Sequence, residues 1–254
     1  MILRRFLWQP TGCASYLLGC TTVGELALVD PHAELADDYL EAAQAAGSRI
    51  AEVIDTHVHA DHRSGAPAIA AACGARLRLP AGAPVSFDFE ALEDGELVVL
   101  GNVRLEVLST PGHAWAHAAL LVTDTTRGEE PWLLLSGDAL FVGDVGRPDL
   151  HGEERALAAA LEHSLRERLL TLPDWIELLP SHVGGSACGA GISSNPSSTI
   201  GFERRANALL ALEGDAFVEA VLGRLSPPPP EFAEIYAENQ RAGVVAAGAE
   251  RSTG

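Results

Sequence analysis

Alternating or apolar runs separated by turn residues open the chain. Such runs cover residues 2–8, 14–19 and 25–29, with Pro-Thr-Gly and Thr-Thr-Val-Gly between them, which predicts three strands of an antiparallel meander. Apolar positions then recur at helical spacing over 35–46, and an apolar run over 49–54 predicts another strand. The order strand, helix, strand indicates an α/β protein.

The same alternation continues to residue 179. Apolar periodicity predicts helices over 65–73 and 153–170, and strands over 76–79, 96–100, 103–108, 118–123, 132–135 and 176–179.

A long loop and a helical region are predicted after the last of these strands. Residues 183–198 are rich in glycine and hydroxyl side chains, and helices follow over 199–212, 215–225 and 231–241. The four prolines at 227–230 predict a stiff connector. It is either a spacer to the last helix or the start of a linker to a further domain.

Length and composition allow one sizeable core or two small ones. With 254 residues, 47% of them hydrophobic, we expect a single domain over residues 1–254. Within it, residues 199–245 are expected to form a C-terminal helical extension, and residues 246–254 are expected to be disordered.

The formal net charge of −18 comes from Asp and Glu spread along the chain, which indicates a solvated surface. Nucleic acid and membranes are therefore not expected as partners. An anionic substrate would need local positive charge from a metal and a nearby Arg.

Cysteine spacing and the N-terminus bear on the compartment. The cysteines show no C-x-x-C spacing, so neither a disulfide framework nor a zinc ribbon is expected. The apolar start of the chain is broken after a few residues, unlike a signal peptide, and no run approaches the roughly 18 apolar residues that span a bilayer. We expect a reducing compartment, the cytoplasm; the cysteines are Cys13, Cys20, Cys73 and Cys188.

A dense group of metal-binding residue types follows the predicted strand at 49–54. His57, His59, Asp61 and His62 lie within six positions. Alternate residues of an extended segment point the same way, so His57 and His59 can face one pocket, and a turn can return Asp61 and His62 to it. Imidazole and carboxylate ligands suit Zn, Fe or Mn. The pattern predicts a metal site that needs further ligands from elsewhere.

The further ligands follow other apolar runs. His113, Asp138 and His182 each come shortly after a predicted strand. The complete pattern, His-x-His-x-Asp-His followed by His, Asp and His, resembles the metallo-β-lactamase superfamily at every position. The resemblance implies a four-layer αββα sandwich with extra C-terminal helices, in which two mixed sheets face each other and the ligands meet at one edge.

Two chemistries fit these ligands, and their spacing leaves both open. In a hydrolase of the glyoxalase II type, two zinc ions or mixed metals bridged by Asp138 activate a water for attack on a thioester. That site uses His57, His59, Asp61, His62, His113, Asp138 and His182.

In the second chemistry, one Fe(II) is held by His57, His113 and Asp138, with open positions for a substrate sulfur and O₂. The outer hydrogen-bonding residues would then be His59, Asp61, His62 and His182. A third class, a metal-stabilised protein without turnover, is disfavoured because structural sites usually close four protein ligands around the ion.

Flanking segments resemble one family more closely. Ser136–Phe141 followed by Gly-Arg-Pro-Asp at 146–149 looks like the persulfide dioxygenases. Residues 185–189 and 196–205 are similar to persulfide dioxygenases fused to rhodanese sulfurtransferase modules. The resemblance implies an iron enzyme, with one Fe(II) per chain, that oxidises a low-molecular-weight thiol persulfide such as glutathione persulfide with O₂ to sulfite and thiol.

The same resemblance bears on partners. The chain stops where the fusions continue into rhodanese, so a separate rhodanese sulfurtransferase is a candidate partner. A homodimer and a homotetramer both stay open.

Three residues are candidates for substrate binding. Arg147 would receive the carboxylate of the carrier thiol, and Asp149 would orient its guanidinium, although such a pair can also simply pin a loop. Cys188, six residues beyond His182, is a candidate to accept or relay sulfur, the alternative being an inert buried thiol. Trp115 and His117 are candidates to line the pocket.

Overall fold

The computed structural model describes residues 1–150 and 152–241, and its strands form two sheets. The first sheet has the same order as the sequence. Its first three strands pair antiparallel and the others parallel. These strands are β1 (Ile2–Trp8), β2 (Cys13–Cys20), β3 (Glu25–Val29), β4 (Arg49–Ile54), β5 (Arg76–Pro80) and β6 (Glu90–Leu92).

The second sheet runs in the order β12-β11-β10-β9-β8-β7. Only β10 and β11 pair in parallel, so this sheet is also mixed. Its strands are β7 (Leu97–Leu100), β8 (Val103–Ser109), β9 (Ala118–Asp124), β10 (Leu133–Gly137), β11 (Glu177–Pro180) and β12 (Ser198–Thr199).

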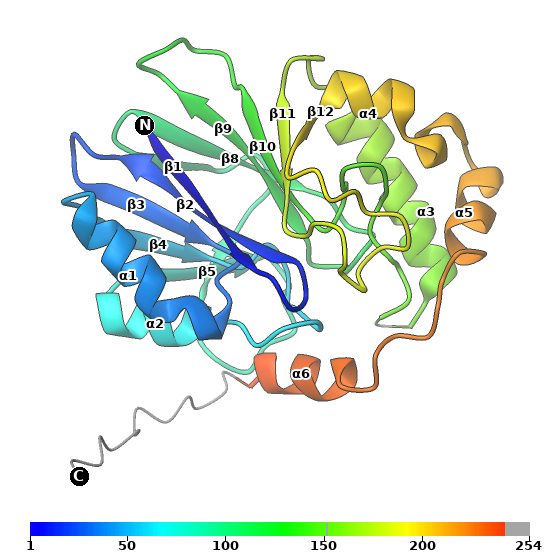
Figure 1. The fold of residues 1–254 in the computed structure, drawn as a ribbon, viewed down its shortest axis with the longest axis horizontal. Coiled ribbons are helices and arrows are strands. Elements are labelled where there is room, and N and C mark those ends of the chain that lie inside the picture. Colours follow the sequence, from blue (N-terminus) through cyan, green and yellow to red (C-terminus); the bar gives the residue numbers. More distant parts are fainter. Residues whose placement is uncertain (151, 242–254) are drawn as a thin grey trace.

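The two sheets face each other across an apolar core (Figure 1). Ile54 of the first sheet and Leu120 of the second belong to this central core. Their neighbours Val53 and Leu121 lie in two other apolar clusters on the outer faces, because successive side chains of a strand point to opposite sides. Both faces of the central strands of each sheet are therefore buried, which explains the long apolar runs in the sequence, whereas the edge strand β7 alternates buried and exposed residues.

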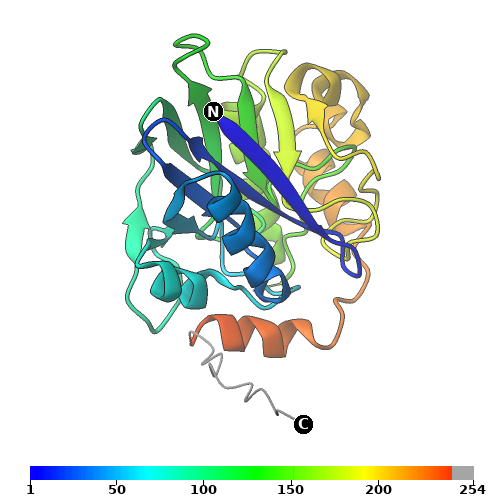
Figure 2. The same cartoon turned by 60° about the vertical axis from the view of Figure 1, so that its left-hand side comes forward.

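Helices cover the outer faces. The first sheet is covered by α1 (Ala36–Ala45) and α2 (Ala66–Cys73), and the second by α3 (Glu154–Ser164), α4 (Ile200–Ala206) and α5 (Asp215–Leu222) (Figures 1 and 2). This arrangement confirms the four-layer αββα sandwich with extra C-terminal helices.

Two predicted helices differ from the structure. The helix expected over 153–170 is α3 followed by a π-helical turn at Leu165–Leu169. The helix expected over 199–212 is interrupted at Asn207, and a 3-10 turn follows at Ala208–Ala211. The Asn207 side chain caps the 3-10 turn and donates to the Asp144 carbonyl, a contact that no local pattern encodes. The short strands β6 and β12 were not predicted.

The last helix lies apart from the other C-terminal helices. The proline run leads into α6 (Phe232–Asn239), at the bottom of Figures 1 and 2. The run therefore acts as a spacer to that helix. The predicted extension over 242–245 and the predicted disorder over 246–254 lie outside the described residues. Within the described ranges, every helix is too short or too polar to cross a lipid bilayer.

Candidate metal centre

The ends of four strands bring the predicted ligands together. His57 follows β4, His113 follows β8, Asp138 follows β10 and His182 follows β11. The nearest ligand atoms of His57, His113 and Asp138 all lie within 4.8 Å of one another. His113 Nε2 is 3.6 Å from Asp138 Oδ2. A two-histidine, one-carboxylate group is thus assembled from three separate loops.

Burial sets the protonation of the two imidazoles. His57, His113 and Asp138 are buried. Burial, together with neighbouring histidines, lowers the pKa of His57 well below its usual range. Burial also lowers the pKa of His113, against the opposing pull of Asp138. Both rings are therefore neutral near pH 7, which is the form that binds a metal.

Hydrogen bonds select which ring nitrogen faces the site. Thr56 Oγ1 donates to Asp30 Oδ2 at 2.9 Å, so it accepts the proton of His57 Nδ1 at 3.0 Å. His113 Nδ1 donates to the Arg147 carbonyl at 2.8 Å. In both rings the lone pair is thereby placed on Nε2.

The donor atoms fit a metal ion. Buried polar atoms in proteins are normally hydrogen-bonded, yet a set of them in this site finds no hydrogen-bond partner among the described residues. All are imidazole nitrogens or carboxylate oxygens, the donors that Fe(II) and Zn(II) take. They are His57 Nε2, His59 Nδ1, His62 Nε2 and Asp138 Oδ2. Of the three rings only His57 is held neutral, since acidic neighbours outweigh burial and raise the pKa of His59 and of His62.

His182 joins two carboxylates. Its Nδ1 lies 2.7 Å from Asp138 Oδ1 and its Nε2 lies 2.8 Å from Asp61 Oδ2. Burial opposes a charge, but Asp138 and the other acidic neighbours outweigh it and raise the pKa of His182 well above its usual range. His182 therefore donates to both carboxylates and leaves Asp138 Oδ2 facing His113.

A second group of ligand types lies beside the first. Asp61, His62 and His182 have ligand atoms within 4.8 Å of one another and of Cys13 Sγ. Cys13 Sγ donates to Asp61 Oδ2 at 3.1 Å. Sequence reasoning missed Cys13, since it lies at the start of a strand far from the other ligands. This group contains three of the residues that a second metal would use.

The predicted substrate residue Arg147 is largely satisfied within the protein. Its Nε and Nη2 each donate to Asp149 at 2.8 Å. Nη1 donates to the Ala187 carbonyl at 2.9 Å, and Nη2 also donates to the Ser226 carbonyl at 2.6 Å. The side chain is 4% exposed. Nearly all of the guanidinium N–H groups are thus engaged, so Arg147 holds three segments of the chain together. Its contact with a carrier thiol stays a prediction.

Cys188 and the two pocket candidates lie at different depths. Cys188 Sγ is 3.9 Å from His182 Nε2, and burial raises the pKa of this thiol above its usual range. Trp115 is 51% exposed and borders a pocket with Val58 and Tyr236. His117 is instead buried, where its Nε2 accepts the backbone N–H of Asp138 at 3.0 Å.

Asp30 is a site residue that sequence reasoning missed. It accepts hydrogen bonds from the Thr56 backbone and hydroxyl, from Ser181 Oγ and from His59 Nε2. It therefore orients the residues beside His57 and His182 as well as His59 itself. Asp30 directly follows β3, as His57 follows β4 after a short turn, and this shared placement is the signal that could have identified it.

The fold and site together define a metalloenzyme of the αββα class. A family model described as the metallo-beta-lactamase superfamily matches residues 8–182. The chain belongs to this superfamily.

Two curated relatives represent the two chemistries. Human "Persulfide dioxygenase ETHE1, mitochondrial" is 29% identical over 96% of this chain and 89% of its own length. A hydroxyacylglutathione hydrolase of Methylococcus capsulatus is 32% identical over 87% of this chain and 84% of its own length.

Solved structures are also similar. A metallo-beta-lactamase from Staphylococcus aureus superposes with a TM-score of 0.89 and 31% identity, covering 95% of this chain and 72% of that one. ETHE1 from Myxococcus xanthus has a TM-score of 0.83 and 26% identity, covering 96% of this chain and 100% of that one. The comparisons confirm the predicted resemblance to persulfide dioxygenases and the prediction that this chain is an enzyme.

Proposed function

We propose that this chain is an Fe(II)-dependent dioxygenase that oxidises a low-molecular-weight thiol persulfide, such as glutathione persulfide, to sulfite and thiol. The observation that carries the proposal is the position of His182, whose two nitrogens hold Asp138 and Asp61 rather than facing an open site. That arrangement suits one metal, with His182 as an outer partner. The nearly full-length similarity to persulfide dioxygenases supports it.

One iron would be held by His57 Nε2, His113 Nε2 and Asp138 Oδ2. Bound Fe(II) supplies open positions at which the substrate sulfur and O₂ can meet. Each persulfide then consumes one O₂ and one water and yields the thiol, sulfite and protons. The protein orients the ligands, through Thr56 for His57 and the Arg147 carbonyl for His113, and it surrounds them with buried groups.

The alternative is a binuclear zinc thioester hydrolase of the glyoxalase II type. The group of Asp61, His62 and His182 favours it, as does the similarity to hydroxyacylglutathione hydrolases. In that case His182 Nε2 would have to leave Asp61 to bind a second ion, with His59 completing the first site.

Metal analysis and oxygen uptake distinguish the two functions. Protein purified without added metal should contain about one iron per chain and consume O₂ when given glutathione persulfide. His113→Ala should lose iron and turnover together because a ligand is removed. Two zinc ions per chain, with hydrolysis of a glutathione thioester and no oxygen uptake, would establish the hydrolase instead.

Arg147→Ala tests the proposed anchor for the carrier. Loss of the guanidinium should lower the free energy of unfolding by about 2–4 kcal/mol because Asp149 and two carbonyls lose their donor. If Arg147 also binds the carrier, KM for glutathione persulfide rises by about one to two orders of magnitude at unchanged iron content. An unchanged KM in the folded variant assigns Arg147 and Asp149 to structure alone.

Four further points stay predictions: the role of Cys188 in sulfur handling, the assembly into a homodimer or homotetramer, a separate rhodanese partner, and the cytoplasmic compartment. Cys188→Ser should lower turnover at unchanged iron content if the thiol takes part, because the metal ligands are untouched. Light scattering of the purified chain reports the assembly.

A further inference from the structure

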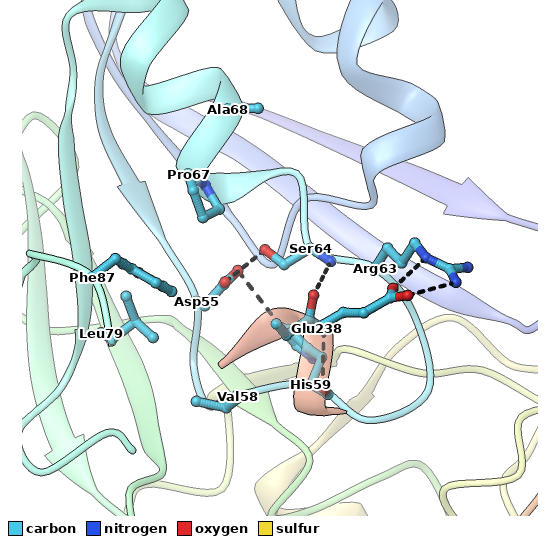
Figure 3. Close-up of a pocket in the computed structure, with 11 residues that line it drawn as sticks. Asp55, Val58, His59, Arg63, Ser64, Pro67, Ala68, Leu79, Phe87 and Glu238 are labelled. Carbon is cyan, nitrogen blue, oxygen red and sulfur yellow. Dashed lines mark hydrogen bonds and ion pairs between the residues drawn. The ribbon is translucent and has the colours of Figure 1, made fainter. Parts of the chain in front are cut away.

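Helix α6 lies across the loop at residues 59–64, which carries the candidate ligands His59, Asp61 and His62. Figure 3 shows Arg63 and Ser64 of this loop beside α6, with Glu238 facing Arg63 and His59 next to the helix. The helix comes about 180 residues later in the chain than His59. It also lies beyond residues 8–182, the part that the superfamily model matches.

Asn239, at the end of α6, binds the loop backbone on both sides of Asp61. Its Nδ2 donates to the His59 carbonyl at 2.9 Å and to the His62 carbonyl at 2.8 Å. Its Oδ1 accepts the backbone N–H of Ser64 at 3.0 Å. Both amide protons and the amide oxygen are thus used on one turn of chain, and this turn carries His59, Asp61 and His62.

Other contacts hold α6 in place without Asn239. Phe232 and Ile235 are buried, and the Gln240 carbonyl accepts the backbone N–H of Ser86 at 2.8 Å. The ion pair between Arg63 and Glu238 is 58% and 33% exposed, and pairs of this kind contribute little. The docking of the helix is therefore largely separable from the three bonds of Asn239.

We propose that Asn239 is a positioning residue for the candidate metal centre, because it holds the turn at 59–62. Asp61 of this turn accepts a hydrogen bond from His182 Nε2, and His182 Nδ1 in turn donates to the candidate ligand Asp138. Metal sites require ligands and their supporting groups to be held within about 0.5 Å. Loss of outer hydrogen bonds typically weakens metal binding by about 10- to 100-fold. The proposal rests on the proposed metal site, and it holds for one metal or two.

Asn239→Leu tests the proposal because it removes all three hydrogen bonds while keeping the branched shape of the side chain. Fe(II) affinity is measured by competition with a chelator, and the metal-free variants are compared by thermal unfolding. We expect about tenfold weaker iron binding, which is the smaller end of the range typical for groups that support metal ligands. Helix α6 should stay docked. Asn239→Gln, which keeps the amide, should recover part of the affinity. The matched control is Glu234→Gln on the exposed side of the same helix, which should bind iron like the wild type.

Iron affinity equal to that of the wild type in Asn239→Leu would overturn the proposal, whatever the effect on unfolding. An equal loss in the Glu234→Gln control would also overturn it. If the proposed metal site itself is wrong, His113→Ala should retain as much iron as the wild type. That result distinguishes an error in the metal site from an error in the role of Asn239.

Discussion

The histidines of this site act differently according to the partners of their two ring nitrogens. His57 and His113 each donate from Nδ1 to an oxygen and are neutral, which places the lone pair on Nε2. His182 meets a carboxylate on each side and carries charge. His117 accepts the Asp138 N–H, so its Nδ1 donates to a threonine hydroxyl. Residue type alone therefore does not define the role.

His117 makes a pH-dependent contribution to stability. Burial lowers its pKa to about 4, from an ordinary value of 6.5. Because the folded state holds the proton less tightly than the unfolded chain, the stabilisation is complete above pH 6.5 and is lost as the pH falls towards 4. A shift of this size corresponds to about 3 kcal/mol.

His117→Gln should therefore show a shallower loss of stability between pH 6.5 and pH 4 than the wild type. Denaturant unfolding of the metal-free protein at a series of pH values measures this slope. Parallel curves for the two proteins would show that His117 does not titrate in this window.

Close backbone approach positions the segments that carry the ligands. A Cβ added to Gly146 would lie 1.9 Å from the Asp138 carbonyl oxygen and 3.3 Å from His113 Cβ. The backbone at residue 146 is thus packed directly against both ligand segments. Only a residue without a side chain fits there, since neither neighbour is the flexible end of a side chain.

Gly146→Ala should separate β10 from the loop that follows it and disturb the metal site. We expect lower iron content and a loss of about 1–3 kcal/mol of stability, as for other overpacked sites. The matched control is Gly128→Ala, whose added Cβ meets nothing within 4 Å. Iron analysis and thermal unfolding of both variants provide the comparison, and a Gly146→Ala protein that matches the control would contradict the expectation.

The candidate metal centre lies between the two halves of the sandwich. His57 follows a strand of the first sheet, whereas His113 and Asp138 follow strands of the second. An ion held by all three links loops from both sheets. Metal binding should therefore stabilise the whole fold rather than one loop.

Removal of the metal with a chelator should lower the midpoint of thermal unfolding. At a free metal concentration 100 times Kd, the bound ion adds about 2.7 kcal/mol. The metal-dependent shift in the unfolding midpoint should vanish in His57→Ala and in His113→Ala, because ligands from both sheets are needed. His163→Ala, on the exposed side of α3, should retain the full shift. A shift that survives in either ligand variant would place the ion elsewhere.

Much of the fold could be predicted from the sequence because its signals are local. The strand expected over 103–108 is β8 at Val103–Ser109, and the helix expected over 35–46 contains α1 at Ala36–Ala45. Alternating or helical spacing of apolar residues is enough for such elements. The three candidate ligands could also be picked out from the sequence, since each follows an apolar run and the spacing matches a known pattern, and their role as ligands stays a prediction.

The tertiary structure alone decided which groups support those ligands. Asn239 and His59 are 180 residues apart, and the Arg147 guanidinium reaches Ser226 across 79 residues. Contacts of this kind depend on how separate elements pack, and no periodicity in the chain records them. The sequence by itself therefore determined the layers and the candidate ligands, whereas packing between distant segments decided their orientation, their protonation and the backbone that holds them.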